Sequence, residues 1–191
     1  MALIFAIVAV ATIGGLLFGY DSGAVNGTQP GLIKAFGLID GSFSPRDGLG
    51  FTVGSLLIGC FIGAFFAGTL ADAIGRRAVM RVSAVLFLIG ALIQGVTSDH
   101  TIFVLARIMG GMAVGAASVL SPAYISEVAP ANIRGRMTTV QQIMIISGLT
   151  AAFLVNYFLA AAAGESTNPF WLGIEAWRWM YLMQAIPAAV F

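Results

Sequence analysis

Long apolar runs alternate with short polar breaks along almost the whole chain. A helix that crosses a bilayer needs about 20 mostly apolar residues, and backbone amides in lipid must be hydrogen-bonded within their own segment, so such runs are helices. The pattern predicts six spans, at residues 3–26, 50–71, 79–97, 101–125, 137–163 and 177–191. The sixth run ends with the sequence, before it is long enough to cross, so we expect a bundle truncated in its sixth helix.

Basic residues in the breaks predict the orientation of these spans. The second and fourth breaks, with the residues beside them, hold Arg76, Arg77, Arg81, Arg134 and Arg136. The other breaks and their flanks hold only Lys34, Arg46 and Arg178. Because loops rich in Lys and Arg stay in the cytoplasm, we expect a multi-pass protein of the cell membrane with a cytoplasmic N-terminus.

Composition excludes a soluble domain and several kinds of chemistry. Hydrophobic residues make up 59% of the 191 residues and charged residues 9%, against about 25% charged residues in soluble domains. The net charge of +1 gives no electrostatic basis for binding nucleic acid. The single cysteine, Cys60, lies in an apolar run and is interpreted as a packing residue. We find no activated nucleophile, cofactor loop or metal-ligand cluster, so we expect neither an enzyme nor a cofactor.

Small residues recur at a spacing that brings helices together. Gly59 and Gly63 lie four residues apart in one span, and Gly111 and Gly115 do so in another. Such spacing lets helix backbones approach closely in lipid. Tight packing explains the glycines, and helices that slide during a transport cycle would show the same pattern.

Two opposite charges lie inside the predicted spans, Asp21 near the end of the first and Arg107 near the start of the fourth. A charge at this depth is costly and normally faces a partner or a cavity. Each lies about 7–9 Å from the same membrane surface at 1.5 Å per residue, which predicts an ion pair. If a conformational change separates the two, Asp21 gains affinity for a proton. The alternative is a static pair that only orients two helices.

Two adjacent amides, Gln141 and Gln142, lie in the fifth span. An amide offers two donors and an acceptor, which suits sugar hydroxyls. Gln142 shares a helix face with Ile145 and Leu149, and small-molecule sites often combine apolar walls with a few polar contacts. A hydrogen bond to a neighbouring helix is the alternative for both amides.

Charged residues of both signs gather at the predicted cytoplasmic ends of the spans. The cluster comprises Asp72, Arg76, Arg77, Glu127, Arg134 and Arg136. Its mixed signs differ from a plain polybasic lipid anchor. We interpret it as ion pairs that hold helix ends together in one state and separate in another. Simple topology signalling would explain the arginines, but not Asp72 and Glu127.

Several motifs together resemble the sugar porter branch of the major facilitator superfamily, and within it the bacterial proton-coupled xylose and glucose transporters. The matching segments are residues 18–21 (FGYD), 68–77 (GTLADAIGRR), 107–111 (RIMGG) with Gly115, 121–130 (SPAYISEVAP), 134–135 (RG) and 177–178 (WR). The resemblance covers nearly the whole chain and implies an all-α integral membrane fold. The fold would be a six-transmembrane-helix bundle of two inverted three-helix repeats, the N-terminal half of a transporter.

The resemblance also implies roles for individual residues. Asp21 would be the proton site and Arg107 its partner. Gln142 would contact a monosaccharide, either a hexose or a pentose, in a cavity lined by Phe18, Ile145 and Leu149. Asp72, Arg76, Glu127 and Arg134 would form an inner gate.

Members of the resembled family have twelve helices, and their second half supplies most contacts to the sugar. Residues 1–191 contain no second bundle, and alternating access needs one bundle to rock against another. We therefore expect the C-terminal six-helix bundle of the same transporter, the lipid bilayer, a sugar and a proton as partners. Three functions remain open: proton-coupled symport, passive facilitation, and a membrane sugar sensor that does not transport.

Overall fold

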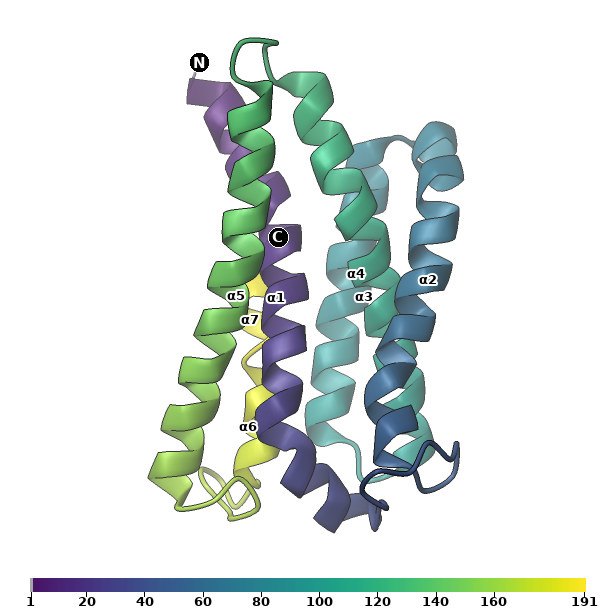
Figure 1. Ribbon diagram of the computed structural model, residues 1–191, viewed down its shortest axis with the longest axis vertical. Coiled ribbons are helices and arrows are strands. Elements are labelled where there is room, and N and C mark those ends of the chain that lie inside the picture. The colour runs from purple at the N-terminus through teal and green to yellow at the C-terminus, as the bar shows by residue number, and fades with distance from the viewer. Residues whose placement is uncertain (1) are drawn as a thin grey trace.

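The structure is a computed structural model that describes the backbone of residues 2–191 and the side chains from Ala11 onward. It is a bundle of long, nearly parallel helices (Figure 1). The elements are α1 (Ala2–Phe36), α2 (Leu49–Ile74), α3 (Arg76–Val96), α4 (His100–Val128), α5 (Arg134–Ala163), α6 (Ala176–Leu182) and α7 (Ala185–Val190). Helices α2 to α5 are each long and apolar enough to cross a membrane, which confirms four of the predicted spans.

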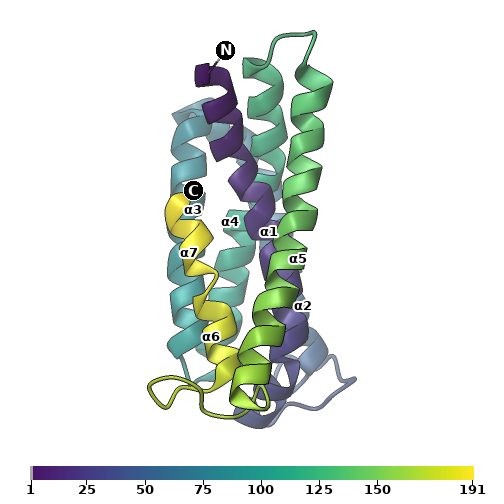
Figure 2. The same cartoon turned by 90° about the vertical axis from the view of Figure 1, so that its left-hand side faces the viewer.

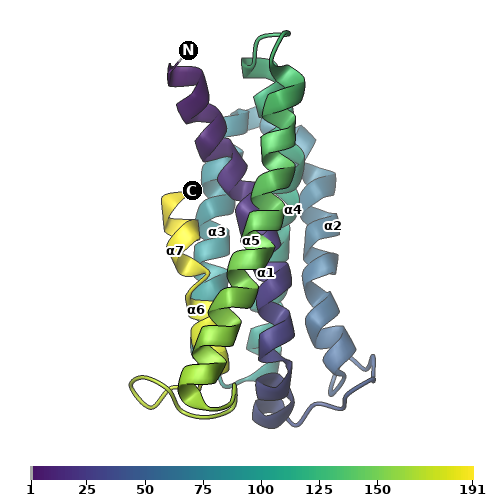
Figure 3. The same ribbon diagram turned by 60° about the vertical axis from the view of Figure 1, so that its left-hand side comes forward.

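The bundle is built from two close helix pairs, α1 with α5 and α2 with α4 (Figures 2 and 3). In the first pair, glycines of α1 recur every four residues along the seam with α5. They are Gly15, Gly19, Gly23 and Gly27, and Gly31 continues the spacing but faces Trp177 of α6. A side chain at Gly19 would run into the Ile145 carbonyl of α5, and one at Gly148 of α5 into the Leu16 carbonyl of α1. Backbone therefore packs directly on backbone, as small residues allow in lipid.

The second pair repeats this arrangement with different residues. A side chain at Gly63 of α2 would meet the Met112 carbonyl of α4. A side chain at Gly115 of α4 would meet the Cys60 carbonyl of α2. If α4, α5 and the sixth span repeat α1, α2 and α3, then the α2–α4 pair corresponds to the α5–α1 pair. The two seams have the relation expected of inverted repeats.

Helix α1 is longer than the sequence predicts, because it continues past residue 26 to Phe36 with Pro30 inside it. The extra turns are held against the rest of the bundle. Gly27, where they begin, packs directly on the Asn156 side chain of α5, which also donates hydrogen bonds to the Gly23 and Ala24 carbonyls at 3.0 and 3.2 Å. Further along, Gly31 packs directly on the Trp177 ring. Tertiary packing thus overrides the helix-ending signal that Gly27 and Pro30 give locally.

The sixth span is not the continuous helix predicted for residues 177–191. It is divided into α6 and α7, with the break at Met183 and Gln184. Pro187 explains the position of the break, because a proline lacks an N–H and its ring clashes with the carbonyl four residues earlier. That carbonyl belongs to Met183, which instead accepts a hydrogen bond from the Ile186 amide at 3.3 Å.

Candidate substrate and proton site

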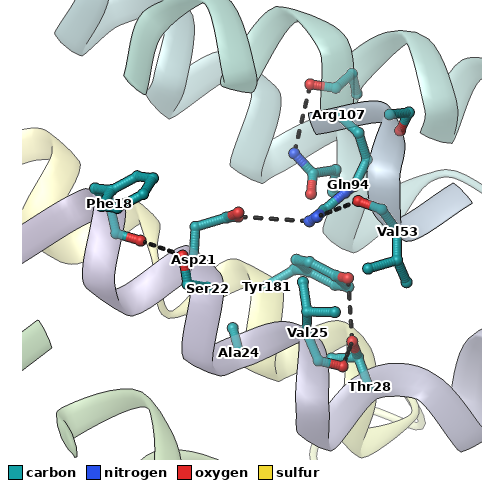
Figure 4. A network of polar contacts seen from close by, with 12 residues as sticks. Phe18, Asp21, Ser22, Ala24, Val25, Thr28, Val53, Gln94, Arg107 and Tyr181 are labelled. Carbon is teal, nitrogen blue, oxygen red and sulfur yellow. Dashed lines mark hydrogen bonds and ion pairs between the residues drawn. The ribbon is translucent and has the colours of Figure 1, made fainter. Parts of the chain in front are cut away.

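The predicted pair of opposite charges forms inside the bundle. Arg107 Nη1 lies 3.5 Å from Asp21 Oδ1, and each side chain is only 1% exposed. At this separation two unit charges attract by about 5 kcal/mol if the effective dielectric constant is about 20. Figure 4 shows Asp21 projecting from α1 towards the guanidinium of Arg107, which comes from α4. The pair therefore links the α1–α5 unit to the α2–α4 unit.

Arg107 has further contacts that do not depend on Asp21. Its Nη2 donates a hydrogen bond to the Val53 carbonyl of α2 at 3.2 Å. Its guanidinium carbon lies 5.9 Å from the centre of the Tyr181 ring, within the range of a cation–π contact. The arginine is thus anchored on the α2–α4 side, and the ion pair is its contact with α1.

Tyr181, on α6, is fully buried and connects the sixth span to this site. Its hydroxyl and that of Thr28 on α1 are hydrogen-bonded at 3.0 Å (Figure 4). Its ring packs edge-on against Phe103 of α4 and against Trp177. The charge pair is therefore enclosed by residues from α1, α2, α4 and α6. Sequence reasoning missed Tyr181 because only the fold brings it to Arg107.

The carboxylate of Asp21 keeps one oxygen available. Within the described part of the chain, Oδ2 is buried and accepts no hydrogen bond. The other oxygen faces Arg107 at 3.5 Å, which is longer than an ordinary charge-assisted hydrogen bond of about 2.7–2.9 Å. A proton could bind at Oδ2 without first displacing a hydrogen-bond donor.

The structure separates the two adjacent glutamines. Gln142 is exposed on α5, whereas Gln141 is buried in the seam with α1. A side chain at Gly15 would come within 2.7 Å of the Gln141 amide nitrogen. Gln141 therefore does not share the exposed face of Gln142. The alternative to a sugar contact is a hydrogen bond to a neighbouring helix; Gln141 does lie between helices, but its Oε1 accepts no hydrogen bond within the described part of the chain.

Of the other predicted sugar contacts, Ile145 and Leu149 lie at this seam, where side chains at Gly15 and Gly23 would meet them. Phe18 instead packs against the cluster that contains Leu17, Phe87 and Ala113. Phe18, Ile145 and Leu149 are each half-buried. Two polar residues that the sequence did not single out, Ser22 and Asn26, are exposed one and two turns beyond Phe18 on α1. The spacing of four residues between them was the available signal. Phe18, Ser22 and Asn26 therefore form a partly exposed strip along α1, and the face of Gln142, Ile145 and Leu149 forms another along α5, the helix paired with α1.

The predicted inner charge cluster forms in part. Arg76 lies 3.2 Å from Asp72 and 2.7 Å from Glu127, which joins the α2–α3 turn to the end of α4. Arg77 instead donates a hydrogen bond to the Tyr124 hydroxyl at 2.7 Å. Neither Arg134 nor Arg136 forms an ion pair with a described side chain.

A family model described as "Sugar (and other) transporter" matches residues 7–191. The chain belongs to this family. It is 43% identical over 185 residues to a glucose transport protein of Synechocystis sp., covering 95% of this chain and 38% of that protein. It is 39% identical over 208 aligned positions to the D-xylose-proton symporter of Escherichia coli, covering 98% of this chain and 42% of the symporter. The chain thus spans about two fifths of these relatives.

Solved structures give the same result for the fold. The inward-open xylose transporter XylE from E. coli superposes with a TM-score of 0.85 at 40% identity, covering 97% of this chain and 46% of that one. XylE bound to 6-bromo-6-deoxy-D-glucose, described as a major facilitator superfamily proton:xylose symporter, gives a TM-score of 0.83 at 40% identity, covering 97% and 42%. The fold is therefore half of a major facilitator transporter, and the homologues are membrane transporters, not enzymes.

Proposed function

We propose that this chain is the N-terminal bundle of a proton-coupled monosaccharide symporter, with Asp21 as the proton site and Arg107 as its partner. The observation that carries the proposal is the buried ion pair between the two helix pairs, with 3.5 Å between its atoms and both side chains 1% exposed. A purely structural tie would not need titratable charge inside a membrane, where charged groups are costly and tend to mark ion pathways.

Protonation of Asp21 would change how the two helix pairs are held together. A neutral Asp21 no longer attracts Arg107, which keeps its contacts with the Val53 carbonyl and the Tyr181 ring. The α1–α5 unit then loses its charged link to the α2–α4 unit and can shift against it. By reciprocity, any rearrangement that separates the pair raises the proton affinity of Asp21.

The sugar would bind along the partly exposed strips of α1 and α5. Gln142 would hydrogen-bond sugar hydroxyls there, with Phe18, Ile145 and Leu149 forming the apolar wall. Ser22 and Asn26 add hydroxyl and amide groups on α1. A sugar held by both helices would act on the same α1–α5 unit that carries Asp21. Its other contacts would come from a C-terminal six-helix bundle.

The inner charge cluster and the orientation belong to the same proposal. With the Arg-rich turns in the cytoplasm, the N-terminus is cytoplasmic, and the Asp72–Arg76–Glu127 contacts close the cytoplasmic side. These contacts would break and re-form as the bundles rock. Arg134 would join them only in another conformation.

An uphill transport assay on the whole transporter tests the proposal. Proteoliposomes with an imposed pH gradient are given radiolabelled D-xylose or D-glucose, the sugars in the relatives' names. The natural protein should accumulate one of these sugars above its external concentration. Asp21→Asn should exchange sugar across the membrane but never accumulate it, and Asp40→Asn, in the exposed 37–48 loop, should behave as the natural protein.

Each other result selects a different function. Accumulation by Asp21→Asn equal to that of the natural protein refutes Asp21 as the proton site. Equilibration without accumulation by the natural protein indicates passive facilitation. Binding of sugar without exchange indicates a sensor.

A further inference from the structure

An uncharged apolar tip projects from the segment between α5 and α6. Between Glu165 and Glu175 this segment contains no charged residue. At its tip Phe170, Trp171 and Leu172 are 41%, 62% and 75% exposed. A group of large exposed apolar side chains marks a surface that contacts either another protein or a membrane. We call these three residues the 170–172 tip.

Hydrogen bonds hold the 170–172 tip in a defined turn. The Phe170 amide donates to the Ile174 carbonyl at 2.9 Å, and the Ile174 amide donates back to the Trp171 carbonyl at 3.2 Å. Leu172 at the apex has a φ of 58°, a left-handed conformation that is uncommon for leucine. The backbone thus presents Trp171 and Leu172 outward in a fixed geometry.

The tip is joined to the outer surface of the sixth span. The Trp171 ring stacks on Trp179 of α6, with 5.4 Å between ring centres, and the Trp179 indole donates to the Trp171 carbonyl at 3.2 Å. Beyond Trp179, exposed apolar side chains continue along α7 as Ile186 and Val190, which are 62% and 67% exposed. Apolar side chains exposed in this way along a spanning segment suit contact with lipid acyl chains.

The segment between α5 and α6 extends this exposed apolar surface outward from the bundle. In Figures 2 and 3 the segment between α5 and α6 reaches out beyond α6 at the level where the helices end. Trp and Tyr concentrate at that level of a bilayer because their rings have an apolar body and a polar N–H or O–H. The Trp171 indole nitrogen donates no hydrogen bond to any described residue, which leaves it free for a lipid headgroup or water.

We infer that the 170–172 tip inserts into the headgroup–acyl boundary of the leaflet on its side and anchors the outer end of the sixth span there. The occupant is the lipid bilayer, because the tip carries no charge, lies at the level where the helices end and continues an exposed apolar surface of a spanning segment. This inference depends only on the chain being a membrane protein and not on proton coupling or sugar binding.

Spin-label accessibility measures the environment of the tip directly. The whole protein is reconstituted in phosphatidylcholine vesicles with any cysteine, including Cys60, replaced by alanine. A nitroxide is attached to Leu172→Cys or to Asp40→Cys, which lies in the α1–α2 connection at the same end of the bundle (Figure 1). Oxygen, which concentrates in lipid, and a water-soluble nickel complex compete as relaxation agents.

We expect oxygen to relax the label at Leu172 more than the nickel complex does, and the reverse at Asp40. A label at Leu172 dominated by the nickel complex would place the tip in water and overturn the inference. A label shielded from both agents would place the tip against protein, either a second bundle or a second copy, and would overturn it as well. A second measurement needs no label. Lipids brominated near the headgroup should quench the tryptophan fluorescence of the natural protein, and part of this quenching should be lost in Trp171→Phe if the tip lies in the bilayer.

Discussion

Replacing Asp21 by asparagine should destabilise the protein by an amount that the surroundings of Arg107 determine. The substitution removes the negative charge and keeps the shape, so it leaves Arg107 as an unpaired charge that is 1% exposed. Breaking a buried ion pair in this way typically costs about 3–5 kcal/mol. Arg107 retains the Val53 carbonyl at 3.2 Å and the Tyr181 ring at 5.9 Å. We therefore expect a loss at the lower end, about 3 kcal/mol.

A second variant distinguishes two contributions to the loss of stability: the unpaired charge on Arg107 and the missing contact with Asp21. Asp21→Asn combined with Arg107→Met removes both charges and fills similar space, so it should regain most of the lost stability. The free energy of unfolding is measured by titrating purified protein with a denaturing detergent and following the loss of helix by circular dichroism. Asp40→Asn is the matched control and should be unchanged, because Asp40 is an exposed loop carboxylate that forms no ion pair with a described side chain.

Two results would refute this reasoning. One is an Asp21→Asn variant as stable as Asp40→Asn, which would mean that Arg107 is not held as a buried charge. The other is a double variant no more stable than Asp21→Asn, which would mean that the destabilisation has a different source.

Three further substitutions test the packing and the site. Gly19→Ala should lower the melting temperature, because the new methyl group meets the α5 backbone and overpacking costs roughly 1–3 kcal/mol. Gly68→Ala, where a new side chain would meet no neighbouring helix within 4 Å, should not lower it. Equal effects of the two variants would contradict direct backbone packing between α1 and α5. Gln142→Ala should weaken sugar binding in an equilibrium assay, whereas Gln141→Ala should lower the melting temperature and keep the affinity; the reverse would reassign the glutamines. Tyr181→Phe should lose about 1 kcal/mol of stability with its buried hydrogen bond, and Tyr181→Leu clearly more; equal losses would exclude a role for the ring.

The sequence predicts the spans and the charge pair well because both follow from the membrane. Lipid requires long apolar helices, so the pattern locates α2 to α5 to within a few residues. The same helices give a depth scale, which places Asp21 and Arg107 at one level of the bilayer. Two opposite charges at one level in lipid leave few arrangements other than a pair.

What the sequence does not determine is how each helix is rotated and where packing overrides local signals. Gln141 and Gln142 are chemically alike, and only the rotation of α5 puts one in the seam and the other on the surface. Helix α1 passes through Pro30 because α5 and the sixth span hold its later turns. Two sequence signals do indicate such features: the glycines repeated every four residues in α1 indicate a close helix contact, and Pro187 indicates the break in the sixth span.

Proton uptake on sugar binding tests the link between Asp21 and transport most directly. Titration calorimetry in two buffers with different heats of ionisation gives the number of protons that the whole transporter takes up as sugar binds, over a series of pH values. We predict net uptake by the natural protein at one or more of these pH values, and none at any pH in Asp21→Asn. Equal uptake by both proteins, or no uptake by the natural protein, would contradict a proton site at Asp21.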